Sequence, residues 1–223
     1  MANEIIPLKT GMVNCYLIKA GDGFVLVDTG ISLSRAVLDR ELEKNGCIPG
    51  KLKLIIMTHG DIDHSGNAFY LSKKFSVKTA MNVNDSAMVE SGKMLMDRGS
   101  GSLTRKIFQF FLFRLPKFRK VIEGFERFTP DVLLEDGFSL ADYGVDAKII
   151  LVPGHTPGSL GVFMADGDFI AGDTLNNNRK PVISPIVHNE AQLNDSIEKI
   201  KLLGIRTVYP GHGRPFMAVE LFK

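Results

Sequence analysis

Tryptophan is absent from the 223-residue sequence, and cysteine occurs only twice, as Cys15 and Cys47. Two cysteines cannot build the framework of a small disulfide-stapled domain, and their spacing matches no metal-binding cysteine motif. Because Cys15 lies within an apolar strand pattern, we expect both thiols to be reduced and structural. Such cysteine usage is typical of proteins in a reducing compartment, so we predict a cytoplasmic location.

The sequence also lacks a long apolar run and a large net charge. No stretch reaches the roughly 20 apolar residues that a membrane span needs, and Met1 to Glu4 lack the basic and apolar parts of a secretory signal. A net charge of +2 gives no reason to expect nucleic acid as a partner. With 44% apolar residues the chain can bury a substantial core. The length of 223 residues allows one or two domains, and we expect a single domain over 1–223.

Strand and helix patterns alternate along the chain, which predicts a mixed α/β (α+β) fold. The expected strands cover residues 13–18, 24–27, 52–57, 77–81, 148–152, 160–165, 169–171 and 207–209. The expected helices cover about 32–44, 65–75 and 190–203. Lys19 to Gly23 separate the first two strands and are typical of a hairpin turn.

The most informative segment directly follows the apolar run 52–57. Within six residues it holds four potential metal ligands, namely His59, Asp61, Asp63 and His64. The end of a core strand is where an α/β sheet usually places its chemistry. Neutral imidazole and carboxylate groups suit zinc, iron and manganese. The segment therefore predicts a metal site.

The other histidines strengthen this prediction. His155 and His212 each follow a predicted strand directly, and Asp173 occupies the same situation. A single histidine after a strand is more often an ordinary hydrogen-bonded residue than a ligand. Four of the five histidines, together with Asp173, instead lie at strand ends flanked by Gly or Pro, which indicates one shared metal centre. The fifth, His188, precedes the last predicted helix, and we expect it to be solvated or to cap that helix rather than to contact a substrate.

Five motifs, in this order, resemble those of the metallo-β-lactamase superfamily. They are Val27–Gly30, Thr58–His64, Pro153–Gly158, Ala171–Thr174 and Pro210–Gly213. The resemblance implies a four-layered αββα sandwich with a two-metal site at one edge of its paired sheets. It also implies a metal-bound hydroxide that attacks an ester, thioester, lactone, amide or phosphodiester.

The resemblance further implies a role for each ligand. The residues divide between two ions, His59 and His155 for the first and Asp63, His64 and His212 for the second. Asp173 would bridge both ions, and Asp63 could also pass a proton from the attacking water to the leaving group. Asp28 matches a position that orients ligands through hydrogen bonds. The alternative for Asp28 is a turn or capping carboxylate before Gly30.

Asp61 departs from the family pattern His-X-His-X-Asp-His, because it replaces the middle histidine. An aspartate side chain is shorter than a histidine side chain, so Asp61 can bind the metal directly only if its turn lies closer to the metal. Otherwise Asp61 acts through a water molecule. With Asp63 and Asp173, Asp61 gives the site three carboxylates, and this increases the preference of the site for iron or manganese relative to zinc. The flavodiiron branch of the superfamily also has a carboxylate there.

Asp61 therefore leaves two functions open, a metal-dependent hydrolase and a diiron redox protein that reduces or senses dioxygen or nitric oxide. Flavodiiron enzymes carry a fused flavodoxin-type domain, whereas eleven residues follow His212, so an external electron donor would be needed. We favour the hydrolase, and we expect it to act on a small-molecule substrate. The helical domain with which long glyoxalase II proteins grip glutathione is not found either, so that substrate is not supported.

Residues 93–128 carry a net charge of +6, which leaves −4 for the rest of the chain, and hold seven of the fifteen phenylalanines. We expect a helical insertion at about 85–130. Its first helix covers 103–114 and ends near Pro116, and a second helix follows and ends at Phe128. In relatives of this family, insertions at this point often cover the active site and shape the substrate pocket. The alternatives are a surface helix pair packed on the core or on a partner subunit in a homo-oligomer, a membrane-surface helix, and a phosphate-binding face of a nuclease.

Overall fold

Two β-sheets form the centre of the protein, whose computed structural model describes residues 4–11, 13–93 and 116–222. The first sheet has the strand order β1-β2-β3-β4-β5-β6. In that order its strands are Ile5–Leu8, Cys15–Ala20, Gly23–Val27, Leu52–Ile56, Thr79–Met81 and Val132–Leu133. The second sheet has the order β13-β12-β9-β8-β7. Its strands are β7 Ala147–Leu151, β8 Leu160–Met164, β9 Asp168–Gly172, β12 Thr207–Pro210 and β13 Phe216–Met217. A separate short pair consists of β10 Leu175–Asn176 and β11 Val182–Ile183.

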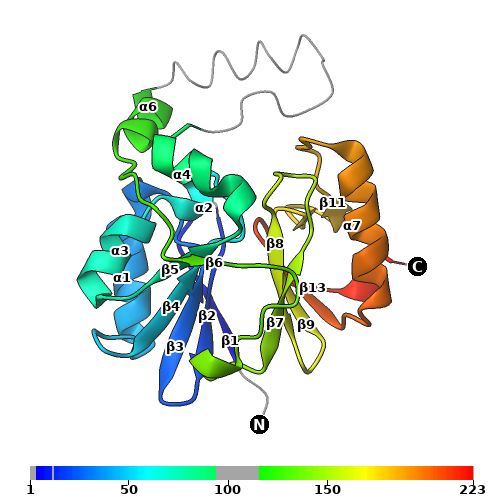
Figure 1. The fold of residues 1–223 in the computed structure, drawn as a ribbon, viewed down its shortest axis with the longest axis horizontal. Helices are drawn as coiled ribbons and strands as arrows, with labels where there is room; N and C mark the ends of the chain where they lie inside the picture. The colour runs from blue at the N-terminus through cyan, green and yellow to red at the C-terminus, as the bar shows by residue number, and fades with distance from the viewer. Residues whose placement is uncertain (1–3, 12, 94–115, 223) are drawn as a thin grey trace.

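Helices cover the outer face of each sheet (Figure 1). On the first sheet lie α1 (Arg35–Lys44) and α3 (Ala68–Phe75), and on the second lies α7 (Glu190–Leu202). The shorter helices are α2 (Ile62–Ser65), α4 (Ser86–Ser91) and α6 (Pro116–Glu123). Single 3-10 turns are η1 (Ser32–Ser34), η2 (Val83–Asp85), η3 (Ala141–Tyr143) and η4 (Ala218–Glu220). The helix–sheet–sheet–helix order confirms the predicted αββα sandwich.

The alternation of apolar side chains along the strands explains these layers. In the first sheet, Leu17 and Leu26 pack with the helices, while their neighbours Ile18 and Val25 face the second sheet. A third apolar cluster lies between the second sheet and α7, where Ile197 is one of its buried members. Each sheet therefore buries both faces, and three apolar layers hold the four structural layers together.

The strand directions bring the turns of interest to one edge. β3 and β4 are parallel in the first sheet, and β9 and β12 are parallel in the second. β7 and β9 both run antiparallel to β8, so these two strands also share a direction. The carboxyl ends of all five strands lead into the edge that carries α2 and β11 (Figure 1).

The structure confirms the predicted hairpin, in which antiparallel β2 and β3 are joined through Gly21 at a φ of 61°. The helix predicted at about 65–75 is found as α3, but it begins only at Ala68, because Gly66 and Asn67 separate α3 from the short helix α2. The Asn67 side chain donates hydrogen bonds of 2.8 Å to the carbonyls of Thr29 and Ile31. Tertiary contacts to the loop after β3 therefore interrupt the helix.

The predicted helix at 103–114 lies outside the described residues, and the second predicted helix ends at Glu123 rather than at Phe128. Phe125 and Phe128 pack against the core on the helix side of the first sheet, as one of the alternatives expected for this segment. A Cβ on Gly124 would lie 2.7 Å from Ser32 Oγ, so the end of α6 packs closely on η1. In the part of the chain that the structure describes, no helix is long and apolar enough to cross a membrane.

Both cysteines are buried and unpaired, as expected. Burial raises the pKa of the Cys15 thiol and of the Cys47 thiol to about 12 in each case. Neither thiol is therefore a reactive thiolate at neutral pH, which agrees with a structural role.

Candidate metal centre

Six histidine and aspartate side chains gather in two adjacent groups at the strand-end edge. The first group is His59, His155 and Asp173, and the second is Asp63, His64 and His212. Within each group one potential ligand atom per residue lies within 4.8 Å of the others. The six residues come from the turns after β4, β7, β9 and β12, so the paired sheets, and not one local motif, assemble both groups.

Asp61, the residue that departs from the family pattern, lies at the first group. Its Oδ2 is 3.3 Å from His59 Nε2 and 3.2 Å from His155 Nε2. Two ligands of one tetrahedral zinc, with bonds of about 2.0–2.1 Å, lie about 3.4 Å apart. The carboxylate of Asp61 therefore reaches a position from which it and both imidazoles could share one ion without a bridging water.

Asp173 belongs to the first group and also contacts the second. Its Oδ1 is 3.2 Å from His64 Nε2, and its Oδ2 is 3.3 Å from His212 Nε2 and 3.8 Å from His155 Nε2. A Cβ at position 211 would overlap Asp173 Oδ1, which explains why glycine precedes His212. One carboxylate thus contacts imidazoles of both groups, the arrangement that a bridging ligand requires.

The buried imidazoles turn their Nε2 atoms toward the cluster because their Nδ1 atoms are held elsewhere. The Nδ1 contacts are His64 to Asp28 Oδ2 at 2.8 Å, His155 to Ile186 O at 2.7 Å, and His59 to Thr58 Oγ1 at 3.0 Å. The Thr58 hydroxyl donates to Asp28, so it can only accept from His59. These partners place a proton on Nδ1, so Nε2 is the nitrogen of each ring that can bind a metal.

Three buried atoms at the centre have no hydrogen-bond partner among the described residues, namely His59 Nε2, His64 Nε2 and Asp173 Oδ1. An unsatisfied buried polar atom costs about 1–3 kcal/mol. Divalent ions would satisfy all three atoms at once, so the side chains present fit a metal centre.

The charges of the site favour cations. Burial disfavours the imidazolium form of His64, but Asp173, Asp28 and Asp63 outweigh it and raise its pKa well above the usual range. Burial likewise opposes the charge on His212, yet hydrogen bonds with Asp173 and Asp63 raise its pKa to about 10. Despite burial, His64 and His212 hold the pKa of Asp173 well below the ordinary value. Without metal, the carboxylates therefore keep protons on these imidazoles.

Asp28, expected to support the site or to serve only its own turn, connects to the ligand-bearing segment after β4. It is 1% exposed and has a φ of 61°, unusual for a residue other than glycine. Its carboxylate accepts hydrogen bonds from the backbone N–H and the hydroxyl of Thr58, each 2.8 Å long, and contacts His64 Nδ1. These long-range contacts, rather than a local turn, occupy its oxygens.

Residues 8–212 match the metallo-β-lactamase superfamily. The chain belongs to this superfamily. An uncharacterised protein of Mycobacterium leprae is 31% identical over 217 residues, which cover 94% of this chain and 91% of that protein. A hydroxyacylglutathione hydrolase of Haemophilus influenzae is 30% identical over 162 residues, 71% of this chain and 64% of that protein. The structure of a metallo-β-lactamase family protein of Thermus thermophilus is similar in fold, with a TM-score of 0.69 at 22% identity over 98% of this chain and 76% of that one.

Several polar residues that hold the site together were not identified from the sequence. The Asn14 side chain donates hydrogen bonds of 2.8 Å to the carbonyls of Pro210 and Gly213, and the Tyr16 hydroxyl donates one of 2.6 Å to the Pro210 carbonyl. They fasten the His212 turn of the second sheet to β2 of the first. An asparagine just before an apolar strand is the only local signal, and it does not reveal a partner almost 200 residues away.

His188 lies outside both groups, as expected. Its side chain is exposed, and its backbone N–H donates to the Gly154 carbonyl at 2.7 Å. The neighbouring Asn189, and not His188, caps α7 through its side chain. The solvated alternative for His188 therefore holds.

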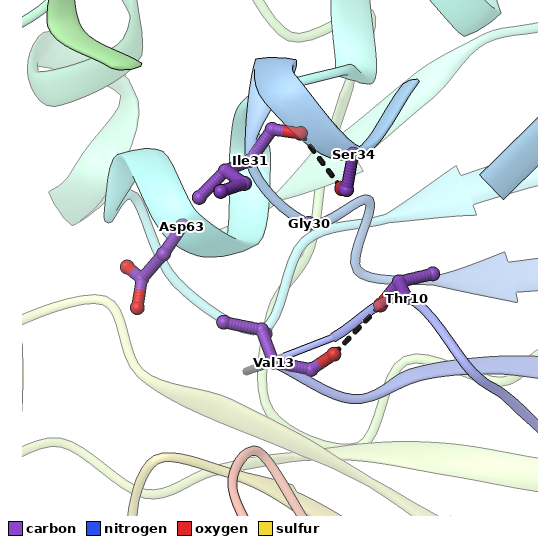
Figure 2. A pocket seen from close by; sticks show the side chains of 6 residues that line it. All are labelled: Thr10, Val13, Gly30, Ile31, Ser34 and Asp63. Atoms are coloured by element: carbon purple, nitrogen blue, oxygen red, sulfur yellow. Dashed lines mark hydrogen bonds between the residues drawn. The ribbon is translucent and has the colours of Figure 1, made fainter. Parts of the chain in front are cut away.

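A small cavity of about 30 Å³ lies beside Asp63, lined also by Thr10, Val13, Gly30, Ile31 and Ser34 (Figure 2). The hydroxyls of Thr10 and Ser34 donate to the carbonyls of Val13 and Ile31, which leaves mainly apolar walls. The space has about the size of one water molecule, but its walls offer few hydrogen-bond partners, and it is too small for a substrate.

Proposed function

We propose that the protein is a hydrolase that works with two divalent metal ions. His59, Asp61 and His155 would hold the first ion, Asp63, His64 and His212 the second, and Asp173 would bridge them. The observation that carries this proposal is the position of Asp173, whose two oxygens contact imidazoles of both groups at 3.2–3.8 Å. The buried Nε2 atoms without hydrogen-bond partners support it.

When bound, two such ions polarise a scissile carbonyl or phosphoryl oxygen and lower the pKa of an attacking water. The side chains of His59, His64 and His155 are at most 2% exposed, whereas those of His212 and Asp63 are 20% and 36% exposed. The substrate would therefore approach from the side of Asp63 and His212.

Asp63 is the carboxylate placed to move protons on that open side. Its Oδ2 lies 3.6 Å from His212 Nε2. Partial burial opposes the charge of Asp63, but His64 and His212 hold its pKa below the ordinary value. An ionised Asp63 can accept a proton from the attacking water and deliver it to the leaving group. Asp28 would fix the ring of His64 throughout this exchange.

The bond that is cleaved is that of an ester, thioester, lactone, amide or phosphodiester. The 30% identical relative from Haemophilus influenzae is a hydroxyacylglutathione hydrolase, and this supports a thioester among the candidates. This departs from the expectation from the sequence, which gave no support to a glutathione thioester. S-lactoylglutathione therefore belongs in a substrate panel beside simple esters and lactones.

A diiron redox protein remains the second candidate because of Asp61. A third carboxylate beside Asp63 and Asp173 favours iron or manganese more than an imidazole in its place would. Elemental analysis of protein from cells grown without added zinc should find two metals per chain, with iron or manganese competing with zinc. Fewer than two metals after mild reconstitution would contradict the two-ion proposal.

A paired assay of the wild type and Asp61→His separates the two candidates. For a hydrolase, the histidine restores the common ligand set, so zinc-dependent turnover of a thioester, ester, lactone or phosphodiester should survive or rise. For a redox protein, the loss of a carboxylate should lower metal-dependent oxygen consumption with an external donor, while hydrolysis stays negligible in both forms. Oxygen consumption without hydrolysis across the panel would overturn the hydrolase proposal.

A further inference from the structure

Asp85, at the end of η2, joins the turn that carries His59 and Asp61 to the turn that carries His155. Its side chain is fully buried. Oδ1 accepts a hydrogen bond of 2.8 Å from the Gly158 N–H, and Oδ2 accepts bonds of 2.9 Å from the Gly60 N–H and 2.6 Å from the Thr156 hydroxyl. Gly60 separates His59 from Asp61, and Thr156 follows His155 directly.

We propose that Asp85 is a positioning residue that sets the distance between the His59–Asp61 turn and the His155 turn. It would thereby shape the first metal group without touching the metal. This inference rests on the two-metal function proposed above and adds to it a selective structural support for one of the two ions.

The chemistry of the site indicates a role beyond ordinary packing. Among the described residues, no Lys, Arg or His forms an ion pair with Asp85, and a buried carboxylate without a cation is costly to keep. Aspartate at the N-cap of a helix usually accepts a bond from its own first turn. Asp85 holds the N-cap position of α4 but makes no such side-chain bond. Its oxygens instead accept bonds from residues 25, 71 and 73 positions away.

Both turns pack directly on the segment around Asp85. A Cβ on Gly158 would lie 2.7 Å from Asp85 Cγ, and a Cβ on Gly60 would lie 3.1 Å from the Asp85 carbonyl oxygen. Since there is no free space on either side, a change at position 85 would be transmitted to both turns. His59 Nε2 and His155 Nε2 each lie only 3.2–3.3 Å from Asp61 Oδ2, and small shifts would spoil that spacing.

The second metal group has a different support. His64 is held by Asp28, and the His212 turn is held by Asn14 and Tyr16. Within the described chain, no hydrogen bond joins Asp85 to Asp63, His64 or His212. Loss of the Asp85 carboxylate should therefore weaken the first group and spare the second.

The test measures zinc affinity by competition with a chelator, in backgrounds that keep only one group intact. In a His212→Ala background, Asp85→Asn should raise the zinc Kd of the first group about 10- to 100-fold. In a His155→Ala background, the same change should leave the Kd of the second group unaltered. In either orientation the asparagine amide turns an NH₂ toward a backbone N–H, so one turn loses its bond.

Asp131→Asn is the matched control. The Asp131 carboxylate also accepts hydrogen bonds from a threonine, but away from the site. The bond from the Thr79 N–H is 2.8 Å long and the bond from the Thr79 hydroxyl is 3.0 Å long. It should leave both zinc affinities unchanged. Thr156→Val removes one donor to Asp85 at constant shape, and it should weaken the first group less than Asp85→Asn does.

Circular dichroism of the metal-free variants checks that they fold. If Asp85→Asn does not fold, the zinc affinities of Thr156→Val provide the test. Equal weakening of both groups, or no weakening by either variant, would overturn the positioning role. Failure of the wild type to bind two ions would instead overturn the proposed function, so the two results are distinguishable.

Discussion

At the scale of residues, the site binds protons where a metal would bind. The pKa of His212 is raised to about 10 and that of His64 well above its usual range, so both imidazoles are protonated at neutral pH without metal. A ligand imidazole must be neutral, so metal binding has to expel these protons. The apparent metal affinity should therefore rise with pH through the neutral range and toward pH 10.

Isothermal titration of the metal-free protein in buffers of different ionisation enthalpy should show protons released on zinc binding. Lowering the pH from 8 to 6 should reduce the affinity. An affinity that stays constant over this range, with no released protons, would contradict the raised pKa values of the two imidazoles.

Replacing Asp173 and replacing Asp28 should affect metal binding and turnover differently. Asp173→Ala removes the carboxylate that contacts both groups, so the occupancy of both metals should fall together. Asp28→Ala should mainly lower turnover, because it frees the ring of His64 without removing a ligand. Asp168→Ala, which breaks a 2.9 Å ion pair with Arg206 at the start of β9, is the control and should retain both metals. Two metals with full turnover in Asp173→Ala would exclude the bridging role.

At the scale of elements, the break between α2 and α3 couples the second metal group to the first sheet. A Cβ on Gly66 would lie 2.6 Å from both the Gly30 and the Ile62 carbonyl oxygens, although its φ of −62° suits any residue. Gly66→Ala should therefore lower the free energy of unfolding by about 1–3 kcal/mol through overpacking alone. Urea unfolding measures this loss.

Gly50→Ala is the control for Gly66→Ala, since its Cβ would meet no atom within 4 Å and its φ of 85° tests only backbone strain. The expected cost there is about 1 kcal/mol. The Gly66 variant should in addition weaken zinc binding at the second group, since His64 is in α2. A Gly66→Ala protein with unchanged stability and metal affinity would show that this close packing is not required.

Local sequence patterns predicted the elements that local chemistry determines. The strand before Thr58, the hairpin at Gly21 and the ligand-bearing turns each follow from a short run of residues. The helix break at Asn67 does not follow from such a run, because the Asn67 side chain donates hydrogen bonds to carbonyls 38 and 36 positions away. Asp85 was missed for the same reason, since nothing in its own neighbourhood shows that its hydrogen-bond donors lie 25, 71 and 73 positions away.

At the scale of the whole molecule, the candidate metal centre lies across the junction of the two sheets. His59, Asp61, Asp63 and His64 follow β4 of the first sheet, while His155, Asp173 and His212 follow strands of the second. Each group thus takes residues from both sheets. The apolar layer between the sheets, with Ile18, Val25 and Ile149 among its fully buried members, holds them together independently of metal.

Metal removal should therefore loosen the strand-end edge while the sandwich remains folded. Chelation should lower the Tm, because ions that bind only the folded chain stabilise it by about 2.7 kcal/mol when present at 100 times their Kd. Far-ultraviolet circular dichroism should change little, since the apolar layers persist. Hydrogen exchange should increase in the turns after β4, β7, β9 and β12 but not in α1 or α7. Two equivalents of zinc should restore both the Tm and the exchange protection, whereas a Tm indifferent to chelator would mean that the two sheets gain nothing from sharing the ions.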